Sequence, residues 1–136
     1  MEVLPKRFAR FSLSLNMQKT RVVDFRKPNR PEDKPESFDF LGFTHYWGRS
    51  RNGRIIHKLK TAKDRLVRSC RAVWEWCRKH LHLTVDEQCR GLNWKLRGHY
   101  NYYGVTHNTR ALRQYHLTVC RTWFRWLRRR GNDGKL

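Results

Sequence analysis

Acidic residues are scarce in this chain: eleven aspartates and glutamates accompany 31 lysines and arginines, so the formal net charge is +20 over 136 residues. Such self-repulsion disfavours a compact state unless a counter-charge is bound, and nucleic acid is the obvious polyanion. A membrane surface is the second candidate, but no apolar run approaches the roughly 18 residues of a spanning helix. The N-terminus also has no apolar stretch that could serve as a secretion signal.

Cysteine pairs are missing as well. None of the four cysteines belongs to a C-x-x-C pair, and each lies among apolar residues at helical spacing: Cys70, Cys77, Cys89 and Cys120. This pattern favours buried free thiols in a reducing cytosol. Zinc is the alternative, because Cys77, His80 and His82 are close in sequence, but no second ligand pair has matching spacing. We therefore expect no metal site.

Clustered carboxylates, which a polymerase or nuclease needs to hold two metal ions, are also lacking. No D-D or D-x-D pair lies beside a predicted strand, and Glu32-Asp33 falls in a proline-rich loop. The chain contains no H-E-x-x-H, no G-x-S-x-G and no phosphate-binding loop. The residues therefore give little support for catalysis by this chain alone.

The first part of the chain contains apolar patterns that predict a small α+β unit. Apolar residues at positions 4, 8, 11 and 15 predict a helix over 4–15, ended by Asn16. Val22, Val23 and Phe25 predict a short strand over 20–25. Three prolines then predict a solvated loop over 27–35.

Two further strands are expected before the pattern changes. The aromatic-rich residues 38–46 predict one strand, and residues 54–60 predict another. Asn52-Gly53 between them is a strong hairpin signal. So few strands do not make a stable sheet by themselves.

From residue 61 the apolar period becomes helical and predicts three amphipathic helices around a shared core. Thr84 and Glu87 have the spacing of a capping box for the second helix, and a loop over 104–109 precedes the third, with Asn108 or Thr109 as its cap. The three apolar stripes are Leu66, Cys70, Val73, Cys77 and Leu81; Val85, Cys89, Leu92, Leu96, Tyr100 and Tyr103; and Leu112, Tyr115, Val119, Trp123 and Trp126 or Leu127. The expected fold is α+β: a helix and small antiparallel strands over residues 1–61, then a three-helix bundle over 62–136.

The helical part is the main candidate for binding a polyanion, because it carries seventeen basic and five acidic residues, a net +12. One face of the second helix and one face of the third should meet nucleic acid. Those faces comprise Arg90, Trp94, Arg97 and Asn101, and Arg121, Arg125 and Arg128. A merely solvated face is the usual alternative, but nearly no acidic residues interleave here to neutralise the charge.

Residues 97–105 read R-G-H-Y-N-Y-Y-G-V, a string dense in aromatic rings behind an arginine. Aromatic faces can stack on bases, and arginine can pair with phosphate. We expect His99 and Tyr102 to be free to contact RNA. Tyr100 and Tyr103 fall on the apolar stripe, where core packing is favoured. The six tryptophans should be mostly core, with Trp94 the exception.

Three strings, taken in order, resemble the C-terminal part of a group II intron-encoded reverse transcriptase/maturase. They are L-S-L-N-M-Q-K-T-R-V-V-D-F at 13–25, F-D-F-L-G-F-T-H-Y at 38–46 and K-L-R-G-H-Y-N-Y-Y-G-V at 95–105. The resemblance runs along nearly the whole chain. The last string is the most specific of the three, and L-N-x-x-K-T is the least.

The resemblance assigns roles by position. Residues 15–20 would form the last helix-to-strand step of the palm, where Lys19 matches a lysine near the departing pyrophosphate and would be the general acid of a completed enzyme. Residues 62–130 would be the maturase-specific thumb domain, a bundle that grips intron RNA and the template-primer duplex. A primer-grip turn would consist of Phe40, Leu41, Gly42 and Phe43, with Gly42 allowing close backbone approach to a nucleic acid strand.

The chain lacks the fingers and the palm core with its Y-x-D-D metal-binding turn, so Mg²⁺ is implied only in a complex with a palm fragment. We expect an RNA-binding fragment that binds group II intron RNA or an RNA–DNA duplex and assists splicing. One alternative is a subunit of a split RNA-directed DNA polymerase, completed by a separate fingers-palm fragment. The other is a truncated gene product with only non-specific polyanion affinity. The resemblance implies the bacterial cytoplasm, with an organelle as the alternative.

Overall fold

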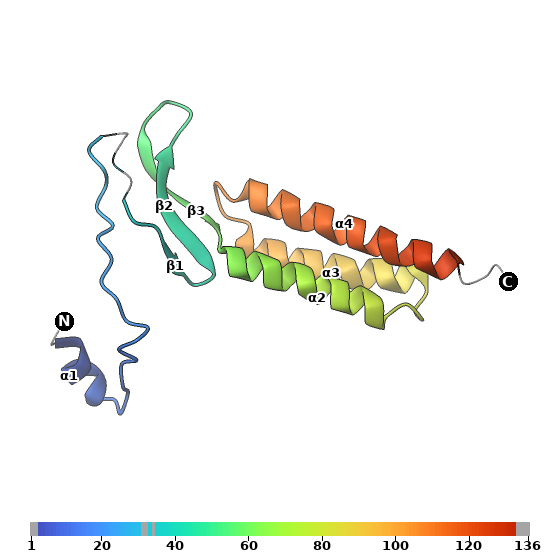
Figure 1. Ribbon diagram of the computed structural model, residues 1–136, viewed down its shortest axis with the longest axis horizontal. Coiled ribbons are helices and arrows are strands. Elements are labelled where there is room, and N and C mark those ends of the chain that lie inside the picture. The colour runs from blue at the N-terminus through green and yellow to red at the C-terminus, as the bar shows by residue number, and fades with distance from the viewer. Residues whose placement is uncertain (1–2, 31–32, 34, 133–136) are drawn as a thin grey trace.

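The computed structural model describes residues 3–30, 33 and 35–132 (Figure 1). The described part of the chain has an α+β fold with four helices and one three-stranded antiparallel sheet, which confirms the expected class. In chain order the elements are α1 (Val3–Ala9), β1 (Phe38–Phe40), β2 (Phe43–Arg49), β3 (Ile55–Thr61), α2 (Lys63–Lys79), α3 (Val85–Tyr103) and α4 (Thr109–Asn132).

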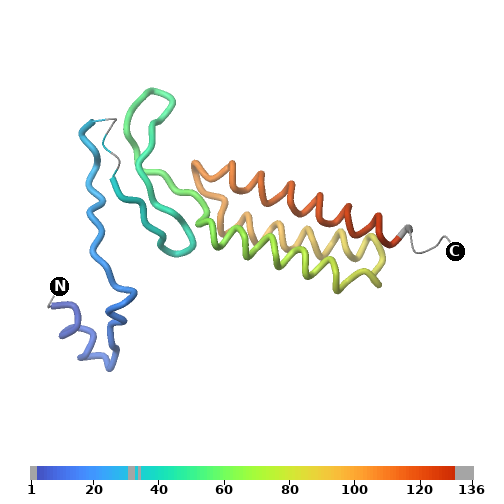
Figure 2. Tube along the Cα trace, viewed as in Figure 1, coloured from blue at the N-terminus to red at the C-terminus, as the bar shows by residue number. Residues whose placement is uncertain are grey.

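Residues 3–30 form an N-terminal arm, which lies to one side of the sheet (Figure 2). The helix expected over 4–15 ends at Ala9, because the amides of Phe11 and Leu13 fold back onto the carbonyl of Phe8 and Ser12 takes a positive φ of 56°. The strand expected over 20–25 is absent, since no neighbouring strand pairs with that segment. The predicted strand is thus wrong, and the predicted helix is confirmed only over its first part. An apolar pattern gains little stability as a regular element when no other element covers it.

The sheet has the order β1-β2-β3 and is built from two hairpins. Residues 38–46, expected as one strand, divide into two strands at a two-residue turn, where Leu41 and Gly42 have φ values of 48° and 81°. Positive φ at both central positions is the type I′ geometry that matches strand twist. The second hairpin, expected from Asn52-Gly53, is confirmed, although only Gly53 of that pair has a positive φ, at 74°.

Aromatic side chains cover one face of the sheet and hold the end of the arm. The ring of Phe25 lies 4.9 Å from that of Phe38 and 5.2 Å from that of Trp47, measured between centroids. His45 stacks on Phe38 at 4.8 Å and contacts His57 through ring nitrogens 3.1 Å apart. Phe25 therefore docks the arm through its side chain, without joining the sheet through its backbone.

Helices α2, α3 and α4 form the expected bundle. Figure 2 shows that α2 leads away from the sheet, that α3 returns toward it and that α4 leads away again. The predicted stripes are confirmed apart from Val85, which is half exposed because it lies in the first turn of α3. Thr84 and Glu87 form the predicted capping box. The buried core consists of Val73, Cys77, Leu92, Tyr115, Val119 and Trp126.

A buried asparagine joins the bundle to the sheet. The side-chain oxygen of Asn108 accepts a hydrogen bond from the Thr61 amide at 2.8 Å, and its amide nitrogen donates to the Thr61 hydroxyl and the Tyr103 carbonyl. Asn108 directly precedes α4, as expected of a cap, yet its side chain binds another element. The division expected between residues 61 and 62 falls at this buried junction, where Ala62 is also buried.

Candidate nucleic-acid interface

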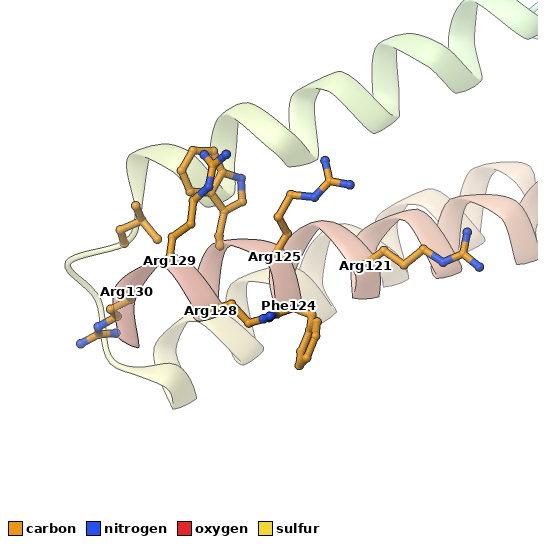
Figure 3. Close-up of a pocket in the computed structure, with 8 residues that line it drawn as sticks. Arg121, Phe124, Arg125, Arg128, Arg129 and Arg130 are labelled. Atoms are coloured by element: carbon orange, nitrogen blue, oxygen red, sulfur yellow. The ribbon is translucent and has the colours of Figure 1, made fainter. Parts of the chain in front are cut away.

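The last turns of α4 carry a groove of about 880 Å³ lined largely by arginines. Figure 3 shows these arginines following one another along the helix, with Phe124 among them. Leu81 and Trp126 complete the lining beside Arg121, Phe124, Arg125, Arg128, Arg129 and Arg130. Arg121, Arg125 and Arg128 are all exposed, as their helical spacing predicts. The structure therefore gathers the three predicted arginines of α4 at one concave surface and adds two more.

Aromatic rings hold several of the cations at this end of the bundle. The guanidinium carbon of Arg128 lies 5.9 Å from the centroid of the Phe124 ring, and that of Arg129 lies 4.8 Å from Trp126. On α2, Arg78 lies 5.4 Å from Trp74. A ring face attracts the cation without neutralising it. These arginines therefore keep both their charge and their N–H donors for an anionic ligand.

The ion pairs of the described residues lie elsewhere. Three are on α2, where Arg65 and Arg68 pair with Asp64 and Arg71 pairs with Glu75. Two more lie between residues 21 and 36. Within the described part of the chain, no arginine of α3 or α4 has a carboxylate partner. Because α4 also contains no acidic residue, its positive charge is the least compensated among the three helices of the bundle.

Sequence reasoning missed Phe124, Arg129 and Arg130 in this groove, and it missed the pair of Trp74 and Arg78 beside it on α2. The available signal was the spacing of aromatic and arginine residues: Trp74 and Arg78 are four apart, and so are Phe124 and Arg128. Side chains four apart are neighbours on a helix, so each ring can lie under an arginine. Trp74 had been expected in the core and is instead partly exposed.

The predicted face of α3 is also exposed. Arg90, Trp94, Arg97 and Asn101 all lie at the surface of the helix, and 76% of Trp94 is open to solvent. Trp94 is thus exposed as predicted, although Trp74 is a second tryptophan outside the core. The structure places this face on a different helix from the arginine groove, so the chain presents two separate basic surfaces.

His99 is not on the surface, and its predicted role in contacting RNA is wrong. The imidazole is buried and stacks on Tyr115 at 3.8 Å between ring centroids. Desolvation by burial lowers its pKa from the usual value near 6.5, so the ring is held neutral. Its position in the string of aromatic residues suggested exposure, but Tyr103, one turn later, packs against the imidazole with ring centroids 4.6 Å apart.

Tyr102 is exposed as predicted, although its hydroxyl is already engaged. That hydroxyl donates a hydrogen bond to the carbonyl of Leu41 at 2.8 Å, and the ring stacks on Phe43 at 5.8 Å. Tyr100 and Tyr103 are half-buried, and desolvation raises the pKa of both phenols. The aromatic string therefore joins α3 to the first hairpin as well as presenting one ring to solvent.

The residues of the expected primer-grip turn do form a turn. Phe40 and Leu41 are exposed at the tip of the β1–β2 hairpin, and Phe43 packs against Tyr102 and Tyr103. A Cβ at Gly42 would lie 3.0 Å from the Tyr103 hydroxyl. The turn conformation and this internal contact therefore explain Gly42 without a nucleic acid strand. The primer-grip role stays a prediction.

Lys19 lies in the N-terminal arm, within a turn built on Asn16. The Lys19 amide hydrogen-bonds to the carbonyl of Asn16 at 3.0 Å, and the Asn16 side chain accepts from Gln18. The lysine side chain is exposed and far along the chain from either basic surface. No group of three or more potential metal ligands lies among the described residues.

The cysteines are free, but they are not all buried. Cys77 belongs to the core, where burial raises the pKa of its thiol to about 11. Cys70 and Cys89 are half-buried, and Cys120 is exposed, which contradicts the expectation of a buried thiol. Cys120 lies one turn after His116 on α4, with its sulfur 3.6 Å from the imidazole.

Comparison of the chain with protein-family models, with curated proteins and with solved structures finds no match. No helix in the described residues is long and apolar enough to cross a membrane. The features of this chain that bear on its function are therefore the two basic surfaces, the aromatic residues that accompany them and the three sequence strings.

Proposed function

We propose that this chain is an RNA-binding fragment of a group II intron reverse transcriptase/maturase, and that its helical bundle binds intron RNA and assists splicing. The observation that carries the RNA-binding part is the arginine groove of α4. Its cations are accompanied by aromatic rings, and within the described residues they have no carboxylate partners. The family assignment is supported by the order and spacing of the three sequence strings.

The chemistry of the groove favours a phosphate backbone as ligand. Arginine offers a planar fork of donors that matches phosphate oxygens, and it stays charged at any pH the protein meets. Several arginines in succession along a helix suit a ligand with repeating charges better than one with a single charge. Phe124, which is 62% exposed, adds a ring on which an unpaired base can stack.

The test is a salt titration of RNA binding. Each phosphate neutralised by the protein displaces counterions, so the logarithm of the affinity falls by about 0.7 to 0.9 per contact for each unit of log salt. With six contacts the slope is roughly −4 to −5. A filter-binding titration from low to moderate salt measures it, and an affinity that does not change with salt would contradict the proposal.

Two triple variants locate the binding surface. Replacing Arg121, Arg125 and Arg128 with glutamine should weaken binding at least 10-fold and reduce the slope by about 2 to 3. Replacing Arg65, Arg68 and Arg71 on α2 removes the same charge but takes arginines that already pair with carboxylates. This control should lose much less affinity. Equal losses of affinity in the two triple variants would show that only the net charge matters. That result is expected of a truncated gene product with only non-specific polyanion affinity.

Specificity for intron RNA needs a second comparison. A folded group II intron RNA should bind more tightly than an unstructured RNA of equal length, because a rigid bundle with two separate basic surfaces can match only a ligand of defined shape. The α4 triple variant should reduce that preference. If both RNAs bind equally well to the unmodified chain, the maturase assignment loses its functional basis.

The split-polymerase subunit is the second candidate, and the exposed apolar residues of the arm favour it. Phe11, Met17 and Val22 are each at least two thirds exposed, and a separate fingers-palm fragment would cover them. Primer extension measured with and without such a fragment separates the two candidates. Extension only after its addition, slowed about 100-fold by Lys19→Ala, would support this candidate, since that loss is typical of a missing general acid.

A further inference from the structure

Gly98 is a glycine inside a helix for which the packing provides no reason. A Cβ at Gly91 would lie 2.6 Å from the ring of Trp76, so the close approach of α2 to α3 explains that glycine. A Cβ at Gly98 would have nothing within 4 Å. Glycine in a helix interior is destabilising relative to alanine, and Gly98 lies near the middle of the second half of α3. The bare backbone there is therefore open to a ligand.

The open space beside the Gly98 backbone forms a gap on the surface of α3. Two exposed aromatic residues border this gap on the same side of the helix. Trp94 precedes Gly98 by four residues and Tyr102 follows it by four, so the three residues lie one above another along α3. The two aromatic residues are about 12 Å apart along the helix axis, at roughly 1.5 Å per residue. Solvent reaches 76% of Trp94 and 54% of Tyr102. The gap is therefore bounded at both ends by ring systems that the protein leaves exposed.

Of the two aromatic rings that border the gap, the ring of Tyr102 is fixed in place. Tyr102 is tied to the β1–β2 hairpin by its hydrogen bond to the Leu41 carbonyl and by stacking on Phe43. The helix itself is fixed by its capping box and by Leu92 in the core. A ligand entering the gap therefore meets a pre-formed surface, which reduces the entropy lost on binding.

The charges around the gap select the ligand. Arg90 lies one turn before Trp94 on the same row of α3, and Arg97 lies on the adjoining row. Both are exposed, and Asn101 supplies amide donors and an acceptor. No acidic residue occurs in α3 after Glu87. A flat aromatic group attached to a chain of anions fits this combination, and a nucleotide has both features.

We propose that Trp94, Gly98 and Tyr102 form a slot that accepts one unpaired base of an RNA, with Arg90 and Arg97 contacting the flanking phosphates. This inference rests on the proposed RNA-binding function and adds a ligand class to the α3 surface. A base in a continuous duplex is stacked on its neighbours and cannot enter. The slot therefore makes the chain prefer an RNA helix interrupted by an unpaired nucleotide over a fully paired one.

Filling the gap tests the slot without damaging the fold. Gly98→Ala and Gly98→Leu place side chains in open space and raise helix propensity, so the melting temperature should rise by about 2 to 5 °C. Both should weaken binding to an RNA hairpin with a single-nucleotide bulge, Leu more than Ala. Trp94→Leu should cost about 5- to 100-fold on the same RNA, the usual range for losing one stacked base. Binding to the fully paired hairpin should change less than twofold.

Matched controls complete the experiment. Asn93→Leu adds the same side chain to an exposed position elsewhere on the circumference of α3 and should leave the preference for the bulge unchanged. A bulge without its base should bind the unmodified chain no better than the paired hairpin does. If the unmodified chain shows no such preference, or if Gly98→Leu keeps it, the slot is refuted while salt-sensitive RNA binding stands. If the unmodified chain binds neither RNA, the proposed function fails as well.

Discussion

Leu13 in the N-terminal arm and Leu92 in the bundle have the same side chain and opposite surroundings. Leu13 is 57% exposed, whereas only 3% of Leu92 reaches solvent. Leu92 belongs to one of the apolar stripes of the bundle, and Leu13 lies in the segment whose apolar positions 4, 8, 11 and 15 have the same helical period. The bundle brings three such patterns together, so each covers the others, but the arm has no second layer against which to bury its own. An apolar stripe stabilises a fold only where another element lies opposite.

The sharpest way to test this contrast is limited proteolysis with trypsin. Residues 1–36 carry nine lysines and arginines, so both regions offer many cleavage sites. The arm needs almost no free energy to open, whereas the bundle must lose its core first. We expect cleavage before residue 37 to be at least roughly 100-fold faster, leaving a resistant fragment that contains the sheet and bundle. Mass spectrometry measures the rate of cleavage in each region. Similar rates would refute the contrast between an uncovered arm and a packed bundle.

Matched leucine substitutions give the next largest effect. Leu92→Ala removes buried methyl groups and leaves a cavity, which should lower the free energy of unfolding by about 2 to 5 kcal/mol. Leu13→Ala makes the same chemical change at an exposed site and should alter it by less than about 0.5 kcal/mol. Urea denaturation followed by circular dichroism measures both. Comparable losses would mean that the arm packs against the rest of the protein in solution.

Asn108 tests the connection between the sheet and the bundle. Asn108→Ala leaves the buried Thr61 amide without its partner and removes one of two hydrogen bonds to the Tyr103 carbonyl, which should destabilise the protein by about 2 to 3 kcal/mol. Asn93→Ala removes an exposed amide whose recorded contact is the Cys89 sulfur at 3.6 Å, and should have little effect. Thermal melting compares the two variants. If Asn108→Ala melts at the same temperature as the unmodified chain, the hydrogen bonds of Asn108 do not stabilise the junction between the sheet and the bundle.

The smallest expected effect is a pH dependence from His99. Burial lowers its pKa in the folded state below the unfolded value near 6.5. Below pH 6.5 the unfolded chain therefore binds a proton that the folded chain resists, so stability should decrease as the pH falls from about 6.5 toward the folded pKa. Above pH 6.5 this contribution is constant. Melting temperatures at pH 7.5 and 5.5 measure the change.

A pair of histidine variants isolates that contribution. His99→Phe keeps a flat ring beside Tyr115 and should make the fall in stability below pH 6.5 shallower. His82 is exposed in the α2–α3 turn, and His82→Phe makes the same chemical change away from the core, so it serves as the control. An unchanged profile in His99→Phe would show that the imidazole is solvated in solution.

Local patterns were a good guide wherever the deciding interaction lies within a few residues. The capping box at Thr84, the turn at Gly53 and the stripe through Val73 and Cys77 all formed as expected, because their partners are close in sequence or recur at the helical period. The exposed arginines of α4 belong to the same group. His99 was misplaced, since its surroundings are set by Tyr115 on another helix.

The sequence by itself determined the positive charge, the three amphipathic helices and the hairpin at Asn52-Gly53, because composition, apolar period and turn residues act locally. Tertiary structure alone decided that residues 20–25 do not form a strand, that Asn108 binds Thr61, and that Leu81 joins the arginines of α4 in lining one groove. It also left the backbone of Gly98 uncovered between two exposed rings. Each of these outcomes depends on which elements meet, and packing across the whole chain settles that.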